Sequence, residues 1–305
     1  MLRLIALAPL AACGFSANTG SSIDGGVDGP GNFDDAAPDA PDAPDGAIDA
    51  AVDAMPDMMV PSSWTAPQQL GIVGSDPTLT ANLLDIWFVF AGDIYHASRP
   101  SVFVAFGTPS RVNELSTLNI EASPEVSPDG NTIYFTRLTG NNDLYVSTRA
   151  SNSDAWSTPQ SILELNTSDH EQGPSMSADG QMLAMSKNPL IGSPDIYIST
   201  RNSPSSPWSS PVAVTEVNSA QSDTNVFLSP DKLTLCFDST RATVARDIYC
   251  AKRSSPTEPF GTPVVLPGIN SALNDGEPWL SASGTLLVFS SDRDGVGRLY
   301  FSFYQ

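Results

Sequence analysis

Acidic residues recur at a fixed place along this sequence, and they are the first candidates for chemistry. A carboxyl group lies six residues before a turn serine in four successive segments: Glu121, Glu171, Asp223 and Asp275. Glu277 and His170 are neighbours of these acids. Paired carboxyl groups can act as acid and base on a glycosidic bond, so the four acids and Glu277 are candidate binding or catalytic residues.

A purely structural role competes with this interpretation. An asparagine, followed by Ser or Thr, lies five residues before three of the acids: Asn166, Asn218 and Asn270. Such side chains satisfy backbone groups in loops, and the acids would then cap the same loops. Recurrence in nearly every segment favours this role, because a catalytic site usually takes different residues from different repeats. We therefore expect no catalytic residue and keep the acids as candidate binding residues.

Other catalytic constellations are absent from the sequence. It has only two histidines, His96 and His170, so a site with three histidine ligands is impossible. There is no HExxH motif, no glycine-rich phosphate loop and no Gly-x-Ser-x-Gly motif. We expect neither a metal site nor a cofactor.

The candidate residues belong to a repeat of about 50 residues, which three markers define. Turn serines 50, 52 and 52 residues apart form the first marker: Ser127, Ser177, Ser229 and Ser281. The aspartate of an Asp-Ile/Leu-Tyr motif forms the second: Asp93, Asp143, Asp195 and Asp247. An aromatic residue with Pro three positions later forms the third: Trp64, Phe106, Trp156, Trp208 and Phe260. A fixed period near 50 is typical of solenoids and propellers.

Each repeat contains four short strand signals and no helical periodicity. In the second repeat we expect strands at 123–127, 132–137, 143–148 and 156–163. Ser127-Pro128-Asp129-Gly130 has the composition of a turn, since Pro sets φ, Asp binds its own backbone and Gly tolerates positive φ. Four antiparallel strands per unit correspond to one blade of a β-propeller.

The ends of the repeat region predict the number of blades and their closure. The last repeat stops at Gln305 after its third strand, while residues 64–72 contain a fourth-strand motif with no strands before it. We expect this N-terminal strand to complete the last blade, which removes the open sheet edges. The sequence therefore predicts an all-β domain, a five-bladed propeller over residues 64–305.

The repeat resembles the bacterial WD40-like (PD40) propellers of the TolB type. The segment from Ser127 to Phe135, followed by Asp143-Leu144-Tyr145, matches the unit of that family, and the resemblance covers residues 64–305. The first repeat departs most, with Thr80-Ala81-Asn82 in place of the turn. The resemblance implies a propeller fold and a protein or peptide partner at one face.

The N-terminus has the pattern of an export signal. Residues 1–12 contain one charge, Arg3, and then an apolar run too short to span a membrane. Leu10-Ala11-Ala12-Cys13 looks like a bacterial lipobox, which implies lipid attachment at Cys13; the alternative is a chance cysteine in an ordinary signal peptide. Gly14 is not the aspartate that retains lipoproteins at the inner membrane. We therefore expect an outer-membrane lipoprotein that faces the periplasm or the cell surface.

Residues 13–63 form the next segment, in which ten aspartates accompany no Lys or Arg. Such a segment cannot bury enough apolar surface to fold, so we expect an extended, disordered tether. A calcium-binding tract is the alternative, but calcium loops need ligands at fixed spacing. Of the formal charge of −20, Arg3 contributes +1 and the tether −10, which leaves −11 for the repeat region. This balance argues against nucleic acid as a partner.

Two further features concern the blades themselves. Cys236 and Cys250 fall on the second and third strands of the fourth repeat, where either a disulfide or two small buried residues would fit. Arginines recur six residues after the aspartate of the second marker: Arg99, Arg149, Arg201 and Arg253. We expect each to bridge to a turn aspartate such as Asp129, and the recurring aromatic residues to pack between blades.

These features together predict a monomeric, lipid-anchored propeller that acts as a binding or scaffold module in the cell envelope. The alternative is a carbohydrate-active hydrolase that uses the carboxyl groups at the mouth of the central channel. A third alternative is a passive surface protein that the tether merely displays.

Overall fold

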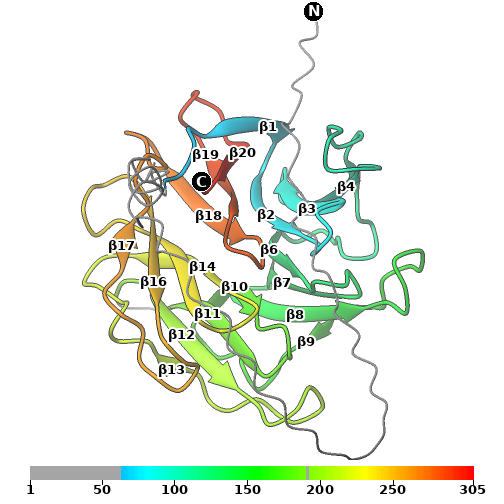
Figure 1. Cartoon of the computed structure of the whole chain (residues 1–305). Coiled ribbons are helices and arrows are strands. Elements are labelled where there is room, and N and C mark those ends of the chain that lie inside the picture. The colour runs from blue at the N-terminus through cyan, green and yellow to red at the C-terminus, as the bar shows by residue number, and fades with distance from the viewer. Residues whose placement is uncertain (1–62, 190–191) are drawn as a thin grey trace, which may run out of the picture. The chain divides into compact units, whose positions relative to one another are not determined.

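Five four-stranded antiparallel sheets form the blades of the propeller in Figure 1. The computed structural model describes residues 63–189 and 192–305. The first blade contains β2 (Ser75–Leu79), β3 (Asp85–Phe90), β4 (Asp93–Ser98) and β5 (Ser110–Arg111). The second contains β6 (Glu121–Val126), β7 (Thr132–Leu138), β8 (Asn142–Thr148) and β9 (Gln160–Ser161).

The remaining blades repeat this order. The third contains β10 (His170–Met176), β11 (Met182–Asn188), β12 (Asp195–Thr200) and β13 (Val212–Ala213). The fourth contains β14 (Asp223–Leu228), β15 (Thr234–Ser239), β16 (Asp247–Lys252) and β17 (Val264–Val265). The fifth contains β18 (Asp275–Leu280), β19 (Leu286–Ser291), β20 (Arg298–Phe303) and β1 (Gln68–Val73).

The N-terminal strand closes the fifth blade, as the sequence predicts. β1 pairs antiparallel with β20, and Trp64 forms an isolated bridge with Tyr304. Ser63, which the sequence assigns to the tether, exchanges two backbone hydrogen bonds with Gln305 at 2.9 and 3.0 Å. The two ends of the repeat region therefore share one sheet, and no blade is left incomplete.

The innermost strands of the blades, β2, β6, β10, β14 and β18, surround the centre of the ring (Figure 1). Because neighbouring strands in a blade are antiparallel, the loop between its second and third strands lies at the same end as the crossover to the next blade. We call this end the crossover face. The candidate acids all lie where a crossover enters an innermost strand.

The turns that contain the marker serines form as the sequence predicts. Ser127 Oγ donates to Asp129 Oδ1 at 2.6 Å and accepts from the Thr132 amide at 2.9 Å. Gly130 has a φ of 77°, and a Cβ there would meet the Asn152 side chain at 2.7 Å. The turn therefore needs both a side-chain acceptor and a glycine at these places.

The recurring arginines do not bridge to aspartates, so that prediction is wrong. Arg149 Nε donates to the carbonyl of Gly130 at 2.8 Å, and its guanidinium lies 4.4 Å from the centre of the Trp156 ring. Arg99, Arg201 and Arg253 stack in the same way on Phe106, Trp208 and Phe260. Asp129 is instead satisfied within its own turn. Stacking on an aromatic ring suits the planar, weakly hydrated guanidinium.

The aromatic residues of the third marker lie in the core but not in the outermost strands. The expected strand at 156–163 shortens to β9, because Pro159 has no amide hydrogen to donate. Trp156 is buried, and its ring packs edge-on against Trp87 of the first blade, 6.3 Å between centres. The expected packing between blades is therefore present here.

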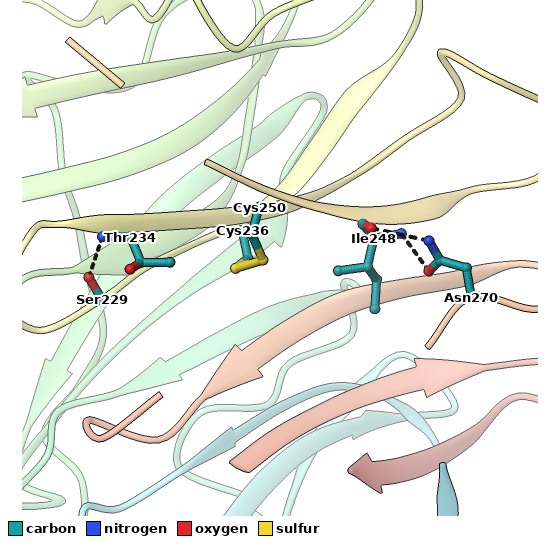
Figure 2. Close-up of a disulfide and its surroundings, with 6 residues drawn as sticks. All are labelled: Ser229, Thr234, Cys236, Ile248, Cys250 and Asn270. Atoms are coloured by element: carbon teal, nitrogen blue, oxygen red, sulfur yellow. Dashed lines mark hydrogen bonds between the residues drawn. A yellow bond between two sulfur atoms is a disulfide. The ribbon is translucent and has the colours of Figure 1, made fainter. Parts of the chain in front are cut away.

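Cys236 and Cys250 are joined by a disulfide between β15 and β16 (Figure 2). The two residues lie directly opposite each other in the strand register, and both side chains are buried. On either side, the Thr234 amide donates to Ser229 Oγ and the Ile248 amide donates to Asn270 Oδ1 (Figure 2). The bond cross-links the two central strands of the fourth blade.

Residues 1–62 lie outside the described residues, and they include the predicted signal peptide, Cys13 and nearly all of the tether. Among the described residues, no helix is long and apolar enough to cross a membrane.

Candidate functional site

The four recurring acids are fully buried in the crossovers and do not form an open ring at the channel mouth. Glu121 accepts hydrogen bonds from the amide of Thr117 at 3.0 Å and from its hydroxyl at 2.6 Å. Arg137 of β7 donates to the same carboxylate at 2.8 Å. Glu121 therefore has three hydrogen-bond donors within the protein and no exposed surface of its own.

The same arrangement recurs in the other crossovers. Each acid has a basic partner from the second strand of its blade or the loop after it: Glu171 with Lys187, Asp223 with Arg241, and Asp275 with Arg293. Asn166 accepts from the Leu144 amide at 2.7 Å, and Asn218 and Asn270 bind the equivalent amides. The structural alternative described for these acids and asparagines therefore fits the geometry.

The centre of the channel is lined by the residues two positions after the acids. One residue of each innermost strand has a φ between 47° and 60° there: Asp76, Ser123, Gly173, Asn225 and Glu277. The strand register is irregular at each of these places. Such bulges turn side chains away from the regular pleat. Together with Glu125 and the prolines that follow, these residues line a cavity of ≈ 40 Å³, room for a few water molecules.

The charged residues near this centre occupy positions at which most other blades have an uncharged residue. Asp238 of β15 occupies the place of Thr136, Ser186 and Ser290 in other blades. Glu125 occupies the place of Thr78 and Ser175 in the first and third blades. Asp76 and Glu277 occupy the place that Ser123, Gly173 and Asn225 hold in the other three blades. Arg246 comes from the long loop between β15 and β16. We call Asp76, Glu125, Asp238, Arg246 and Glu277 the central cluster.

Asp76 and Glu277 are in direct contact across the junction between the first and fifth blades. The amide of Asp76 donates to Glu277 Oε2 at 2.8 Å, and Ser290 Oγ donates to the same oxygen at 2.5 Å. The carboxyl oxygens of Asp76 accept from the hydroxyls of Ser75 and Ser123, both at 2.8 Å. Glu277, a sequence-predicted site residue, thus lies at the centre, whereas Asp275 does not.

Asp238 and Arg246 complete the cluster on the fourth blade. Asp238 is fully buried and accepts from Thr224, Asn225 and the amide of Glu277. Arg246 Nη1 lies 3.6 Å from Asp238 Oδ2 and 3.5 Å from Glu277 Oε1, and its side chain is 39 % exposed. The charge of Arg246 also acts on Asp76. One guanidinium therefore lies near three carboxyl groups, those of Asp76, Asp238 and Glu277, which would leave a net charge of −2 if all three were ionised.

Burial raises the pKa of three carboxyl groups in the central cluster. Burial, and then the charge of Glu277, raise the pKa of Asp76 to about 7. Burial raises the pKa of Asp238, although Arg246 opposes the rise. Burial also raises the pKa of Glu125 to about 8, while its oxygens accept from Thr78 at 3.1 Å and from Ser175 at 3.2 Å. Near neutral pH Glu125 therefore keeps its proton and Asp76 is only partly ionised.

Neither histidine reaches this centre. His170 Nδ1 accepts from the Asn142 amide at 3.1 Å, and His96 Nε2 lies 2.8 Å from Asp85 Oδ1. In the described part of the chain, no group of three or more His, Cys, Asp or Glu side chains is arranged to hold a metal ion.

The sequence analysis singled out Glu277 but not Asp76, Glu125, Asp238 or Arg246. These residues differ from the residues at the equivalent positions of other blades. The acids that the sequence analysis selected are, in contrast, residues that recur. An acid that replaces Ser or Thr at one blade alone has no counterpart in the common framework, so it is a stronger candidate for function than an acid present in four blades.

Comparisons with known proteins support the architecture. No protein-family model and no curated protein matches the chain. An endo-arabinase from Bacteroides thetaiotaomicron has a TM-score of 0.55 and 12 % identity, covering 80 % of this chain and 98 % of that one. A thermostable family-43 glycoside hydrolase has a TM-score of 0.54 and 15 % identity, covering 76 % and 89 %. A putative TolB from Agrobacterium tumefaciens has a TM-score of 0.49 and 17 % identity, covering 73 % and 72 %.

These likenesses concern the fold. At 12 % and 15 % identity, the endo-arabinase and the family-43 hydrolase show a shared fold and do not show a shared function. The chain is an all-β, five-bladed propeller with an acidic central cluster on its crossover face.

Proposed function

We propose that this chain is a lipid-anchored binding module of the bacterial cell envelope, and that its ligand contacts the central cluster. One observation carries the proposal: the five charged residues of the central cluster stand where most other blades have uncharged residues, and they converge from four different blades. The framework does not require a charge at these places, because other blades have uncharged residues there, such as Ser175, Phe227 and Trp279 at the place of Glu125. Non-repeating charges that converge on one place favour a selected function.

The chemistry of the cluster favours a ligand with a positive charge and hydrogen-bond donors. Three carboxyl groups lie near one guanidinium, and the repeat region as a whole carries a charge of −11. A lysine, an arginine or a terminal amine of a protein or peptide would favour the ionised forms of these carboxyl groups and would bind them by charge-assisted hydrogen bonds. The resemblance of the repeat to WD40-like propellers supports the same class of partner. We propose a monomeric module without a cofactor, and no nucleic acid as partner.

Attachment at Cys13 belongs to the same proposal. The lipobox-like sequence before it supports cleavage and acylation, and more than one acyl chain would give stable anchoring where one is marginal. We propose an outer-membrane lipoprotein facing the periplasm or the cell surface. Cys13→Ala should release the protein from membranes and abolish labelling by a palmitate analogue. Membrane association that persists in this variant would show that lipid is not the anchor.

Affinity capture tests the binding proposal. The full-length lipoprotein, solubilised in detergent, is incubated with envelope proteins and, separately, with envelope glycans. We expect a specific protein to bind the wild type and to be lost from Asp76→Asn and Glu277→Gln. Asparagine tolerates the positive φ of Asp76, and glutamine keeps the shape of Glu277, so both variants should fold. Glu258→Gln, at an exposed loop carboxylate, is the matched control. Equal capture by all four proteins would refute a central binding site.

A carbohydrate-active hydrolase is the second candidate, and the contact between Asp76 and Glu277 favours it. Different environments can make one carboxyl group of a pair a proton donor and the other a base or nucleophile. The structural neighbours described as an endo-arabinase and a glycoside hydrolase give a first substrate to test, arabinan. Release of reducing sugar that disappears in Asp76→Asn and in Glu277→Gln, while binding persists, would favour this candidate over the binding module.

A further inference from the structure

Large apolar side chains are exposed on one part of the crossover face. They lie in the loops and crossovers at three adjacent blade junctions, namely the fourth with the fifth, the fifth with the first, and the first with the second. We call this set the apolar arc: Val73, Phe90, Leu118, Ile120, Val244, Leu273 and Val296. Exposed apolar side chains that gather on one face of a propeller are candidates for an interaction surface.

The loops of the apolar arc are held in place, so the exposure is part of the fold. The amide of Glu121, next to Ile120, donates to the carbonyl of Gly92 at 2.9 Å. The amide of Asp275 donates to the carbonyl of Arg246 at 2.9 Å, which fixes the loop of Val244 against the crossover of Leu273. Backbone hydrogen bonds thus tie these loops to neighbouring crossovers.

The apolar arc and the central cluster lie on the same side of the face. Asp76, Arg246 and Glu277 come from the first, fourth and fifth blades. The two junctions that join these blades carry four of the seven apolar residues: Val73, Val244, Leu273 and Val296. At the other two junctions, the described loop and crossover residues include Asn141, Asp169 and Gln221, and among them Leu163 is the one exposed large apolar side chain. A partner that contacts the centre from this side would therefore cover the arc.

We propose that the apolar arc is a docking surface for a protein segment that combines large apolar side chains with a lysine or arginine. This docking depends on the proposed function, because the basic group would meet the central cluster while the apolar groups cover the arc. Charge complementarity favours this occupant, since the repeat region carries −11. A second copy of the chain would bring the same negative charge to the contact.

Selection from a random peptide library tests this assignment, because it requires no identified partner. Phage that display random twelve-residue peptides are selected on the immobilised full-length protein. We expect enrichment of peptides in which a lysine or arginine lies between large apolar residues. One enriched peptide, labelled with a fluorophore, is then titrated against the wild type and three variants by fluorescence anisotropy.

The variants separate the apolar arc from the central cluster. The arc variant combines Leu118→Ser with Val244→Ser, at two fully exposed positions. Its matched control combines Leu163→Ser with Val212→Ser, whose side chains lie outside the arc and are 79 % and 68 % exposed. Glu277→Gln tests the centre. We expect about tenfold weaker binding by the arc variant, unchanged binding by its control, and weaker binding by Glu277→Gln.

Several results would overturn the assignment. Binding to the arc variant with wild-type affinity would show that the arc is not the docking surface, even if Glu277→Gln weakens binding. The reverse pattern would leave the arc in place and refute the central site. Absence of enrichment, or enrichment of peptides without basic or apolar residues, would also overturn it. So would self-association or flotation with phosphatidylcholine vesicles that the arc variant alone loses, since the occupant would then be a second copy or a bilayer.

Discussion

Replacement of Glu125 by glutamine should make the stability of the propeller much less dependent on pH. Glu125 lies on β6, where its carboxyl oxygens accept hydrogen bonds from the hydroxyls of Thr78 and Ser175. Burial raises its pKa from the ordinary 4.5 to about 8. Below pH 4.5 the group is protonated in both the folded and the unfolded chain, so it does not affect the balance between them.

Between pH 4.5 and about 8 the two states differ. The unfolded chain loses the proton of Glu125 while the folded protein keeps it, so the free energy of unfolding falls as pH rises. The pKa rises by about 3.5 units, from 4.5 to about 8, and each unit corresponds to about 1.4 kcal/mol. The upper limit is therefore roughly 5 kcal/mol, and water entry into the channel should reduce the measured value to roughly 2–5 kcal/mol.

Urea unfolding at pH 5 and pH 9 measures this effect. We expect Glu125→Gln to gain about 2 kcal/mol or more relative to the wild type between these two conditions. The exposed Glu258→Gln serves as the control, and it should follow the wild-type profile. Asp76 also titrates in this range, so the quantity to compare is the difference between variant and wild type. Parallel profiles for wild type and Glu125→Gln would refute a protonated Glu125 in the folded protein.

Three further predictions concern the framework. Glu121→Ala should cost about 3–5 kcal/mol in urea unfolding, because it leaves the Arg137 guanidinium buried without its carboxylate; a loss below about 1 kcal/mol would contradict the buried pair. Deletion through Ile72 should expose the edge of β20 and cause aggregation detectable by light scattering, whereas deletion of residues 14–62 should leave the thermal midpoint unchanged; equal damage would contradict closure by β1. Replacement of Cys236 and Cys250 by alanine should cost about 3 kcal/mol, and an unchanged unfolding midpoint would contradict the cross-link.

The sequence predicted the blades because their determinants are local and repeated. Each turn serine binds amides within a few residues of itself, as Ser127 does with Thr132, so composition and spacing are sufficient to locate the turns. The closing strand followed from counting incomplete repeats. The sequence analysis assigned Ser63 to the tether and did not predict that it pairs with the last blade, because its two hydrogen bonds connect it to Gln305 at the opposite end of the chain.

The position of the acids was predictable, but their surroundings were not. A common offset from the turn placed Glu121 correctly at the entry to β6. The sequence did not reveal that Arg137, 16 residues later, would donate to the same carboxylate. Two positions further on, a bulge turns the chain so that Ser123, rather than Glu121, faces the channel. A one-residue irregularity of this kind changes which side chains reach the centre.

The arginine prediction failed for a related reason. Spacing along a strand shows which residues lie at the same end of a blade, and Arg149 does lie beside the turn that contains Asp129. Spacing does not show which of several nearby acceptors the guanidinium will bind. Asp129 is occupied by Ser127 and Asn131, so the guanidinium binds the carbonyl of Gly130 and stacks on Trp156.

The carboxyl group of Glu277 offers the most direct test of the proposed binding site. The protein is labelled with ¹³C at the side-chain carboxyl carbons of glutamate, and the signal of Glu277 is assigned through its loss in Glu277→Gln. An enriched basic peptide is then added in increments at pH 7. We predict that the Glu277 signal shifts and saturates with the peptide, while the signal of the exposed Glu258 stays in place. Saturable binding of the peptide without a change in the Glu277 signal would contradict a site at the central cluster.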